Sequence, residues 1–138
     1  MTELPIVRSF KDAQGIEITF YEWPVANPKA SVQIVHGLGE HARRYDHVAE
    51  ALNKAGYGVY ADDHRGHGVT GSNMRAKGLI KQQGNLGPGG MPATFAAVRQ
   101  LSRSASPMTM SSGPNRKRSR SPRPTRATRQ WSGMAVRT

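Results

Sequence analysis

The sequence predicts an α/β fold over residues 1–101, followed by a disordered basic tail over residues 102–138. Short β-branched runs alternate with a stretch of helical periodicity, and this order of strand, helix and strand is typical of a parallel sheet with flanking helices. The acidic residues stop where this pattern stops. Residues 1–101 hold 11 Lys and Arg against 9 Asp and Glu, whereas residues 102–138 hold 9 Lys and Arg and no acid. Most of the net charge of +11 therefore lies in the tail.

Two strands are predicted before residue 37. The segment Gly15–Phe20 alternates apolar and polar residues with period two, which is typical of a half-buried strand. Pro24 and the pair Asn27-Pro28 mark its end. The segment Ala30–His36 is rich in β-branched residues, and we expect a short strand that runs directly into a glycine turn.

A helix and a third strand should follow. Over Tyr45–Ala55 the apolar residues recur at spacings of three and four, and Gly56 stands where a left-handed C-terminal cap would fall. The apolar run Tyr57–Ala61 predicts the next strand, and the glycines at 66, 68 and 71 predict a loop after it. This order implies a right-handed crossover and a parallel strand pair, with functional turns at the carboxyl ends of the strands.

A second helix is predicted before the tail. Residues 84–90 form another glycine-rich loop, and Pro92 suits the first turn of a helix. The buried stripe of this helix should consist of Phe95, Ala96, Ala97, Val98 and Leu101.

The tail lacks the residues that build a core. Residues 102–138 contain no Leu, Ile, Phe or Tyr, so they bury too little apolar surface to offset the entropy of ordering, and disorder is expected. The basic run 115–124 resembles arms that bind nucleic acid or anionic membranes. Because no aromatic residues are interleaved for base stacking, a nucleic-acid partner is not favoured.

Composition also bears on location and cofactors. The chain has no cysteine, which excludes disulfides and thiolate metal sites and fits a reducing compartment, so a cytoplasmic location is expected. No secretory signal is evident, and no apolar run approaches the roughly 20 residues of a membrane-spanning helix. Asp63, His64 and His67 crowd one glycine-rich turn without the spacing of zinc ligands, so no metal site is expected.

The strand expected at 30–36 ends in the tetrapeptide His36-Gly37-Leu38-Gly39. Glycines in such a turn let the backbone approach a ligand closely and leave amide hydrogens pointing outward. In acyl transfer the reacting carbonyl becomes an oxyanion, which preorganised amide donors stabilise. The tetrapeptide alone is weak support for this chemistry, because ordinary strand-to-helix loops carry the same glycines.

A larger pattern makes the tetrapeptide informative. The block 36–45, H-G-L-G-E-H-A-R-R-Y, precedes the block 63–68, D-H-R-G-H-G, with a helix and a strand of suitable length between them. This arrangement resembles the monoacylglycerol-lipase and lysophospholipase branch of the α/β-hydrolases, over about residues 10–101. The resemblance implies the N-terminal part of an α/β-hydrolase sheet with flanking helices.

The same resemblance implies a serine hydrolase that acts on a small ester or lipid substrate and uses no cofactor. The oxyanion hole would be formed by His36, Gly37, Leu38 and Gly39, with the backbone amide of Leu38 as one donor. Glu40 and Arg44 would brace the turn near the polar end of an acyl-glycerol pocket. The supporting loop would consist of Asp63, His64, Gly66, His67 and Gly68, as scaffold rather than as acid or base.

The resemblance also implies parts that this sequence does not contain. Family members carry the nucleophilic serine in a G-x-S-x-G elbow, and no such pentapeptide occurs in the 138 residues. Ser132 lies between Trp131 and Gly133, but it lacks the first glycine of the elbow and a preceding strand. After Leu101 there is no His, Asp or Glu, so the catalytic acid and base are missing as well.

Two interpretations follow. The first is an ester-hydrolase lineage in which residues 1–101 are a partial domain, inactive by itself, and the tail is out-of-frame sequence of the kind that a frameshift produces. The second is a hydrolase-like remnant whose basic tail binds nucleic acid or an anionic membrane. Sequencing the gene across the codons for Gln100–Ser106 distinguishes a frameshift from an uninterrupted frame.

Overall fold

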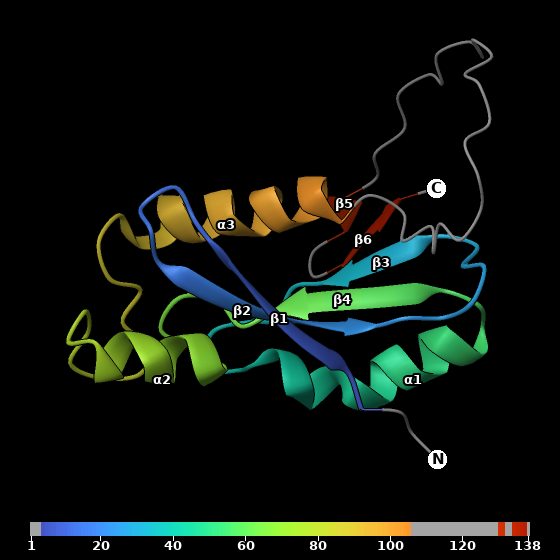
Figure 1. Cartoon of the computed structure of the whole chain (residues 1–138), viewed down its shortest axis with the longest axis horizontal. Coiled ribbons are helices and arrows are strands. Elements are labelled where there is room, and N and C mark those ends of the chain that lie inside the picture. Colours follow the sequence, from blue (N-terminus) through green and yellow to red (C-terminus); the bar gives the residue numbers. More distant parts are fainter. Residues whose placement is uncertain (1–3, 106–129, 132–133, 138) are drawn as a thin grey trace, which may run out of the picture.

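The computed structural model describes residues 4–105, 130–131 and 134–137. These residues form one mixed sheet with helices on both faces, α3 on one side and α1 and α2 on the other (Figure 1). The strands in spatial order are β1 (Ile6–Lys11), β2 (Glu17–Trp23), β4 (Gly58–Asp62), β3 (Ser31–Ile34), β6 (Met134–Arg137) and β5 (Gln130–Trp131). The helices are the 3₁₀ helix η1 (Ala42–Tyr45), α1 (Asp46–Lys54), α2 (Gly68–Ala76) and α3 (Gly90–Ser104). This architecture confirms the predicted α/β class, and none of the described helices has the length and apolar character needed to cross a membrane.

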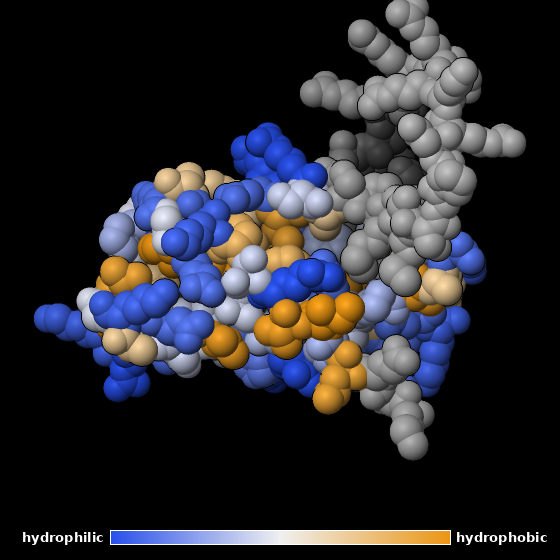
Figure 2. Space-filling view, viewed as in Figure 1, coloured by the Kyte–Doolittle hydropathy of each residue, from blue (hydrophilic) through white to orange (hydrophobic). Residues whose placement is uncertain are grey.

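An antiparallel hairpin, of which the sequence predicted only the second strand, forms one edge of the sheet. All six residues of β1 pair with β2. The apolar residues Leu4, Ile6 and Val7 are exposed, and they interrupt the polar surface over β1 (Figure 2). An edge strand that buries so little has no clear alternation of apolar and polar residues, which explains why the sequence did not predict it.

The predicted strand, helix and strand are all present between residues 31 and 62. β3 and β4 are parallel, with Val32 opposite Val59, and α1 lies between them in the chain. Gly56 follows α1 with a φ of 92°, as predicted for a left-handed cap. A core cluster joins the strands to η1 and α1, and its buried members are Tyr21, Trp23, Ile34, Ala42, Ala49, Val59 and Ala61.

The prediction of a loop after β4 is wrong from Gly68 onward, where α2 begins. The glycines suggested a loop, but hydrogen bonds with residues outside the helix hold its first turn in place. The Asp63 carboxylate accepts the N–H of Val69 at 2.9 Å, and Thr70 Oγ1 accepts the N–H of Thr19 from β2 at 2.9 Å. These tertiary contacts override the low helix propensity of glycine.

α3 contains Pro92 in its first turn, as predicted, but its buried stripe differs from the prediction. Thr94, Ala97 and Leu101 are buried, Val98 is half-buried, and Phe95 and Ala96 are exposed. The buried positions follow the helical spacing of three and four, whereas adjacent residues such as Phe95 and Ala96 fall on another face. Gln33 of β3 donates to the carbonyl oxygen of Val98 at 3.1 Å, which ties this helix to the sheet.

The structure describes the predicted disordered tail at a few positions only. α3 continues to Ser104, and β5 and β6 lie within residues 102–138. β6 runs antiparallel to β3, with Val136 opposite Val32, and so occupies the edge of β3 that does not face β4. Residues 106–129, 132–133 and 138 lie outside the described residues, and disorder there stays a prediction.

Gly66 is a position where an added side chain should cost much stability. Its φ is 72°, and a Cβ would overlap with the backbone carbonyl of Asn85, which cannot swing aside as a flexible side chain can. We expect Gly66→Ala to lower the free energy of unfolding by about 2–4 kcal/mol, because backbone strain and overlap add together. Urea denaturation followed by circular dichroism measures this loss.

Gly78→Ala is the matched control for this variant. Gly78 has the same φ of 72°, but nothing lies within 4 Å of the added Cβ. Its loss should stay near 1 kcal/mol, the usual cost of a left-handed conformation in a residue other than glycine. Equal losses in the two variants would show that the contact with Asn85 does not matter.

Candidate functional site

The turn after β3 places a backbone amide at the surface. The chain bends at residues 37–40, where Gly39 has a φ of 74° and the N–H of Glu40 approaches the carbonyl oxygen of Gly37 at 3.3 Å. Leu38 is 74% exposed, and its N–H has no hydrogen-bond acceptor among the residues that the structure describes. The turn therefore presents an amide donor at the residue for which the sequence predicts an oxyanion contact.

Glu40 holds this turn through its carboxylate. Oε2 accepts the N–H of Gly37 at 3.1 Å and the hydroxyl of Tyr45 at 2.7 Å, while Arg44 Nη1 lies 3.8 Å from Oε1. The hydrogen bond from Tyr45, followed by that from Gly37, lowers the pKa of Glu40. Because the Arg44 side chain is 60% exposed, water screens its charge and the two short hydrogen bonds do most of the bracing. Tyr45 was not predicted as a site residue, since nothing local in the sequence distinguishes it from a core residue of the helix.

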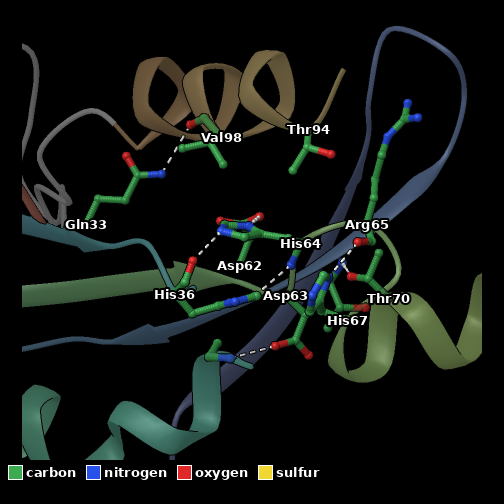
Figure 3. A network of polar contacts seen from close by, with 12 residues as sticks. Gln33, His36, Asp62, Asp63, His64, Arg65, His67, Thr70, Thr94 and Val98 are labelled. Carbon is green, nitrogen blue, oxygen red and sulfur yellow. Dashed lines mark hydrogen bonds and ion pairs between the residues drawn. The ribbon is translucent and has the colours of Figure 1, made fainter. Parts of the chain in front are cut away.

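His36 and His64 join the carboxyl ends of β3 and β4 by reciprocal hydrogen bonds (Figure 3). The N–H of His64 donates to His36 Nε2 at 3.0 Å, and His64 Nε2 donates to the carbonyl oxygen of His36 at 3.1 Å. The rings stack with their centroids 3.8 Å apart. His36 Nδ1 lies 2.8 Å from the carbonyl oxygen of Gly37, and His64 Nδ1 lies 2.8 Å from Asp62 Oδ2. All four ring nitrogens therefore have partners within the protein.

These partners give the two rings different charges. Both nitrogens of His64 face oxygen acceptors, an arrangement that favours the form in which both carry hydrogen and the ring is positively charged. Burial alone would lower the pKa of His64, but the hydrogen bond and charge of Asp62 outweigh it, so the pKa is raised. Burial, followed by the charge of His64, lowers the pKa of His36 to about 4. His36 is therefore neutral, and because its Nε2 accepts a hydrogen bond, its hydrogen lies on Nδ1.

Asp63 is a buried carboxylate that joins three elements. Oδ1 accepts the N–H of Ala42 at 2.8 Å, and Oδ2 accepts the N–H of Val69 at 2.9 Å and the hydroxyl of Tyr21 at 3.0 Å. Gly68 lies so close that a Cβ there would overlap with this carboxylate. Burial, followed by the charge of Asp63, raises the pKa of Tyr21, which keeps its hydroxyl a donor. The contacts give Asp63 and Gly68 structural roles.

Arg65 fixes the loop after β4, although the sequence analysis did not single it out. Its side chain is 1% exposed, and Nε donates to Asp12 Oδ2 at 2.8 Å. The guanidinium also donates to Gln14 Oε1 at 2.8 Å and to the carbonyl oxygen of Pro88. His67 Nδ1 in turn donates to the carbonyl oxygen of Arg65 at 2.8 Å. No local pattern could have revealed this ion pair, because its members lie 53 residues apart.

A pocket of about 160 Å³ lies between the turn and α3. Its lining includes five of the predicted site residues, namely His36, Gly37, Leu38, His64 and His67. The remaining lining residues are Val35, Leu86, Met91, Thr94, Phe95 and Val98, so the walls are largely apolar. The other predicted site residues, Gly39, Glu40, Arg44, Asp63, Gly66 and Gly68, do not line the pocket.

The described residues do not assemble a catalytic triad. Asp62 and His64 form a carboxylate–imidazole pair, but His64 Nε2 donates to the backbone carbonyl of His36 and not to a serine. No serine in the described part of the chain contacts a histidine, and no group of three or more candidate metal ligands was found there. The arrangement offers an amide donor beside an apolar pocket, without a nucleophile.

Replacing Asp62 should change the titration of His64. In the variant Asp62→Asn the carboxylate no longer opposes the effect of burial, so the pKa of His64 should fall below its ordinary value of about 6.5. In the unaltered chain, the raised pKa stabilises the fold fully below about pH 6.5, and this contribution is lost as the pH rises through the folded value. NMR titration of the imidazole protons and urea denaturation at several pH values measure both effects.

Asp46→Asn is the control for this prediction. Asp46 begins α1 and pairs with Arg43, so its removal changes the net charge equally but leaves the contacts of His64 intact. The titration of His64 should then stay as in the unaltered chain. If the two variants shift the pKa of His64 alike, the effect belongs to net charge and not to the Asp62 contact.

Comparisons with known proteins place this geometry in a family. Residues 26–85 match the Hydrolase_4 family, described as serine aminopeptidase S33. Over 64 residues the chain is 47% identical to the monoacylglycerol lipase of Mycolicibacterium smegmatis, a match that covers 46% of this chain and 23% of that lipase. Over 66 residues it is 48% identical to Protein K6 of vaccinia virus (strain Western Reserve), a match that covers 47% of this chain and 82% of Protein K6.

Solved structures agree with the sequence matches. A thermostable carboxyl esterase from Bacillus coagulans superimposes with a TM-score of 0.58 at 30% identity, over 75% of this chain and 33% of the esterase. A soluble variant of monoglyceride lipase from Saccharomyces cerevisiae has a TM-score of 0.58 at 25% identity, over 75% of this chain and 31% of the lipase. The chain thus matches less than a third of the lipases compared here, always in their N-terminal portion. It belongs to the α/β-hydrolase superfamily, within the group that contains the monoacylglycerol lipases.

Proposed function

We propose that the chain is the oxyanion-binding portion of a serine ester hydrolase that acts on monoacylglycerols, lysophospholipids or similar small esters, and that by itself it does not complete the reaction. The observation that carries the proposal is the N–H of Leu38, which has no acceptor among the described residues and lies at the rim of an apolar pocket. The names of the lipase and esterase relatives support the substrate class.

The pocket suits an ester better than a charged ligand. Its apolar walls can hold a hydrocarbon group, while the N–H of Leu38 can donate to the carbonyl oxygen as negative charge develops there. Of the three histidines in the lining, His36 and His64 have both ring nitrogens paired, and the unpaired Nε2 of His67 is buried. A neutral ester whose hydrocarbon part lies against Val98 and Phe95 fits this distribution of polar and apolar groups.

The chain contributes no attacking group to this reaction. His64 is not placed to act as a general base, because both of its ring nitrogens are engaged by oxygen atoms within the protein. The sequence has no G-x-S-x-G elbow, and it has no His, Asp or Glu after Leu101. We therefore propose that residues 1–101 form a partial hydrolase domain and that residues 102–138 are a tail of frameshift origin. The absence of cysteine supports a cytoplasmic location.

Exchange of the matched segment tests the oxyanion role. Residues 26–85 of this chain would replace the corresponding segment of the Mycolicibacterium smegmatis lipase, which supplies the missing catalytic parts. We expect the chimera to hydrolyse monoacylglycerol and Leu38→Pro to reduce kcat by about 10²–10³, because proline has no N–H to donate. Leu38→Ala, which keeps the amide, should retain the rate of the chimera. Equal rates for Leu38→Pro and Leu38→Ala would refute the role of this amide.

The chain as it stands should not hydrolyse esters. We expect purified protein to release p-nitrophenol from p-nitrophenyl esters at the rate of buffer alone, because no activated serine is present. A fluorescent serine-directed phosphonate should leave it unlabelled, with the intact Mycolicibacterium smegmatis lipase as the positive control. Turnover above background that the phosphonate abolishes would show that the inactive part of the proposal is wrong.

A further inference from the structure

Two peptide groups in the turn after β3, the one between His36 and Gly37 and the one between Gly37 and Leu38, each receive a hydrogen bond from a histidine ring. The carbonyl oxygen of His36 accepts from His64 Nε2 at 3.1 Å, and the N–H of the same peptide group, on Gly37, donates to Glu40 at 3.1 Å. The carbonyl oxygen of Gly37 lies 2.8 Å from His36 Nδ1, and the N–H of that peptide group belongs to Leu38. The first peptide group is satisfied at both ends, whereas the second has its N–H unpaired within the described residues.

We propose that the imidazole of His36 is a positioning residue for the oxyanion donor, because it orients and polarises the peptide group that carries the N–H of Leu38. A peptide group is planar, and its C=O and N–H point in opposite directions. The carbonyl oxygen of Gly37 also accepts the N–H of Glu40 at 3.3 Å, but His36 Nδ1 lies closer, at 2.8 Å, and this bond aims the N–H of Leu38 away from the ring. The proposal rests on the proposed function only in naming what this N–H binds.

The surroundings of His36 keep it in the tautomer that this role requires. The N–H of His64 donates to Nε2, so Nε2 must carry a lone pair and the hydrogen must lie on Nδ1. The reverse tautomer would place an N–H against the N–H of His64 and a lone pair against the carbonyl oxygen of Gly37. His36 is 5% exposed, so water cannot readily replace either partner. The ring is thus a fixed donor to Gly37.

The hydrogen bond from His36 Nδ1 to the carbonyl oxygen of Gly37 should also make the N–H of Leu38 a stronger donor. Withdrawing electron density from a carbonyl oxygen makes the N–H of the same peptide group more acidic, and successive hydrogen bonds polarise one another in this way. The chain runs from the N–H of His64 through the ring of His36 and the carbonyl oxygen of Gly37 to the N–H of Leu38. Because this N–H has no acceptor among the described residues, its acidity can be measured directly.

The test compares variants by NMR of the full chain, with the amide of Leu38 as the reporter. His36→Phe keeps a ring but removes the donor, so we expect the amide proton of Leu38 to move upfield and its base-catalysed exchange to slow by about two- to tenfold, the range of one neutral hydrogen bond. His36→Asn places an amide N–H near the position of Nδ1 and so keeps a donor to the carbonyl oxygen of Gly37, so it should restore both values in large part. His41→Phe, at an exposed histidine beside the turn, is the matched control and should change neither.

A folded His36→Phe variant in which the chemical shift and exchange rate of the Leu38 amide are unchanged would overturn the proposal. A His36→Asn variant with the same shift and exchange rate as His36→Phe would overturn it too. Where His36→Phe fails to fold, the unaltered chain still decides. A scalar coupling across the hydrogen bond between His36 Nδ1 and the Gly37 carbonyl carbon is expected in isotope-labelled protein, and its absence at a well-resolved resonance would contradict the proposal. These readouts involve no ester, so the assays of the lipase chimera fail or succeed independently of them.

Discussion

The buried carboxylate of Asp63 is the constraint on which the rest of the structure depends. A buried charge without partners would cost more than the fold could offset, so donors must converge on it. They come from Ala42 at the start of η1, from Val69 at the start of α2 and from Tyr21 on β2. One side chain at the end of β4 therefore sets where two helices begin and how they lie against the sheet.

The hydrogen bond between Asp63 and Ala42 also helps to fix the turn at residues 37–41. Ala42 marks the end of the segment that leaves β3 through residues 37–41, so the bond between Ala42 and Asp63 closes this segment from its far side. The reciprocal bonds between His36 and His64 close it from the near side. Glu40 then takes the N–H of Gly37, which leaves Leu38 as the exposed amide. The position of the donor is thus a result of which other polar groups are already paired.

Local patterns in the sequence predicted the parts of the fold that local forces determine. β3, α1 with its Gly56 cap and β4 follow from periodicity and from one left-handed glycine, and the structure contains all of them. β1 and α2 were missed because contacts with other parts of the chain stabilise them. The side chains of β1 are mostly exposed, and α2 begins at Gly68, next to Val69, whose N–H is capped by Asp63. The stripe on α3 was misplaced at Phe95 because apolar character alone does not give the face of a helix.

In the candidate site, too, the features set by local sequence were predicted and those set by tertiary contacts were not. Its backbone turn was predicted from the glycines, whereas the pairings of Asp62 with His64 and of Tyr45 with Glu40 were not. A histidine in a sequence shows neither its tautomer nor its charge, and both depend here on hydrogen-bond partners that the fold brings together.

Among the described residues, the side chains that hold the turn lie between the end of β3 and the start of α2. Glu40 binds Tyr45 and the N–H of Gly37, whereas Asp63 and His64 bind other groups around the turn, and none of these printed bonds involves the described residues of β5 or β6. Stabilisation of an oxyanion is effective when its donors are fixed before the reaction, so that no reorganisation accompanies the development of charge. In this structure the N–H of Leu38 is held in place by groups that all lie before residue 70.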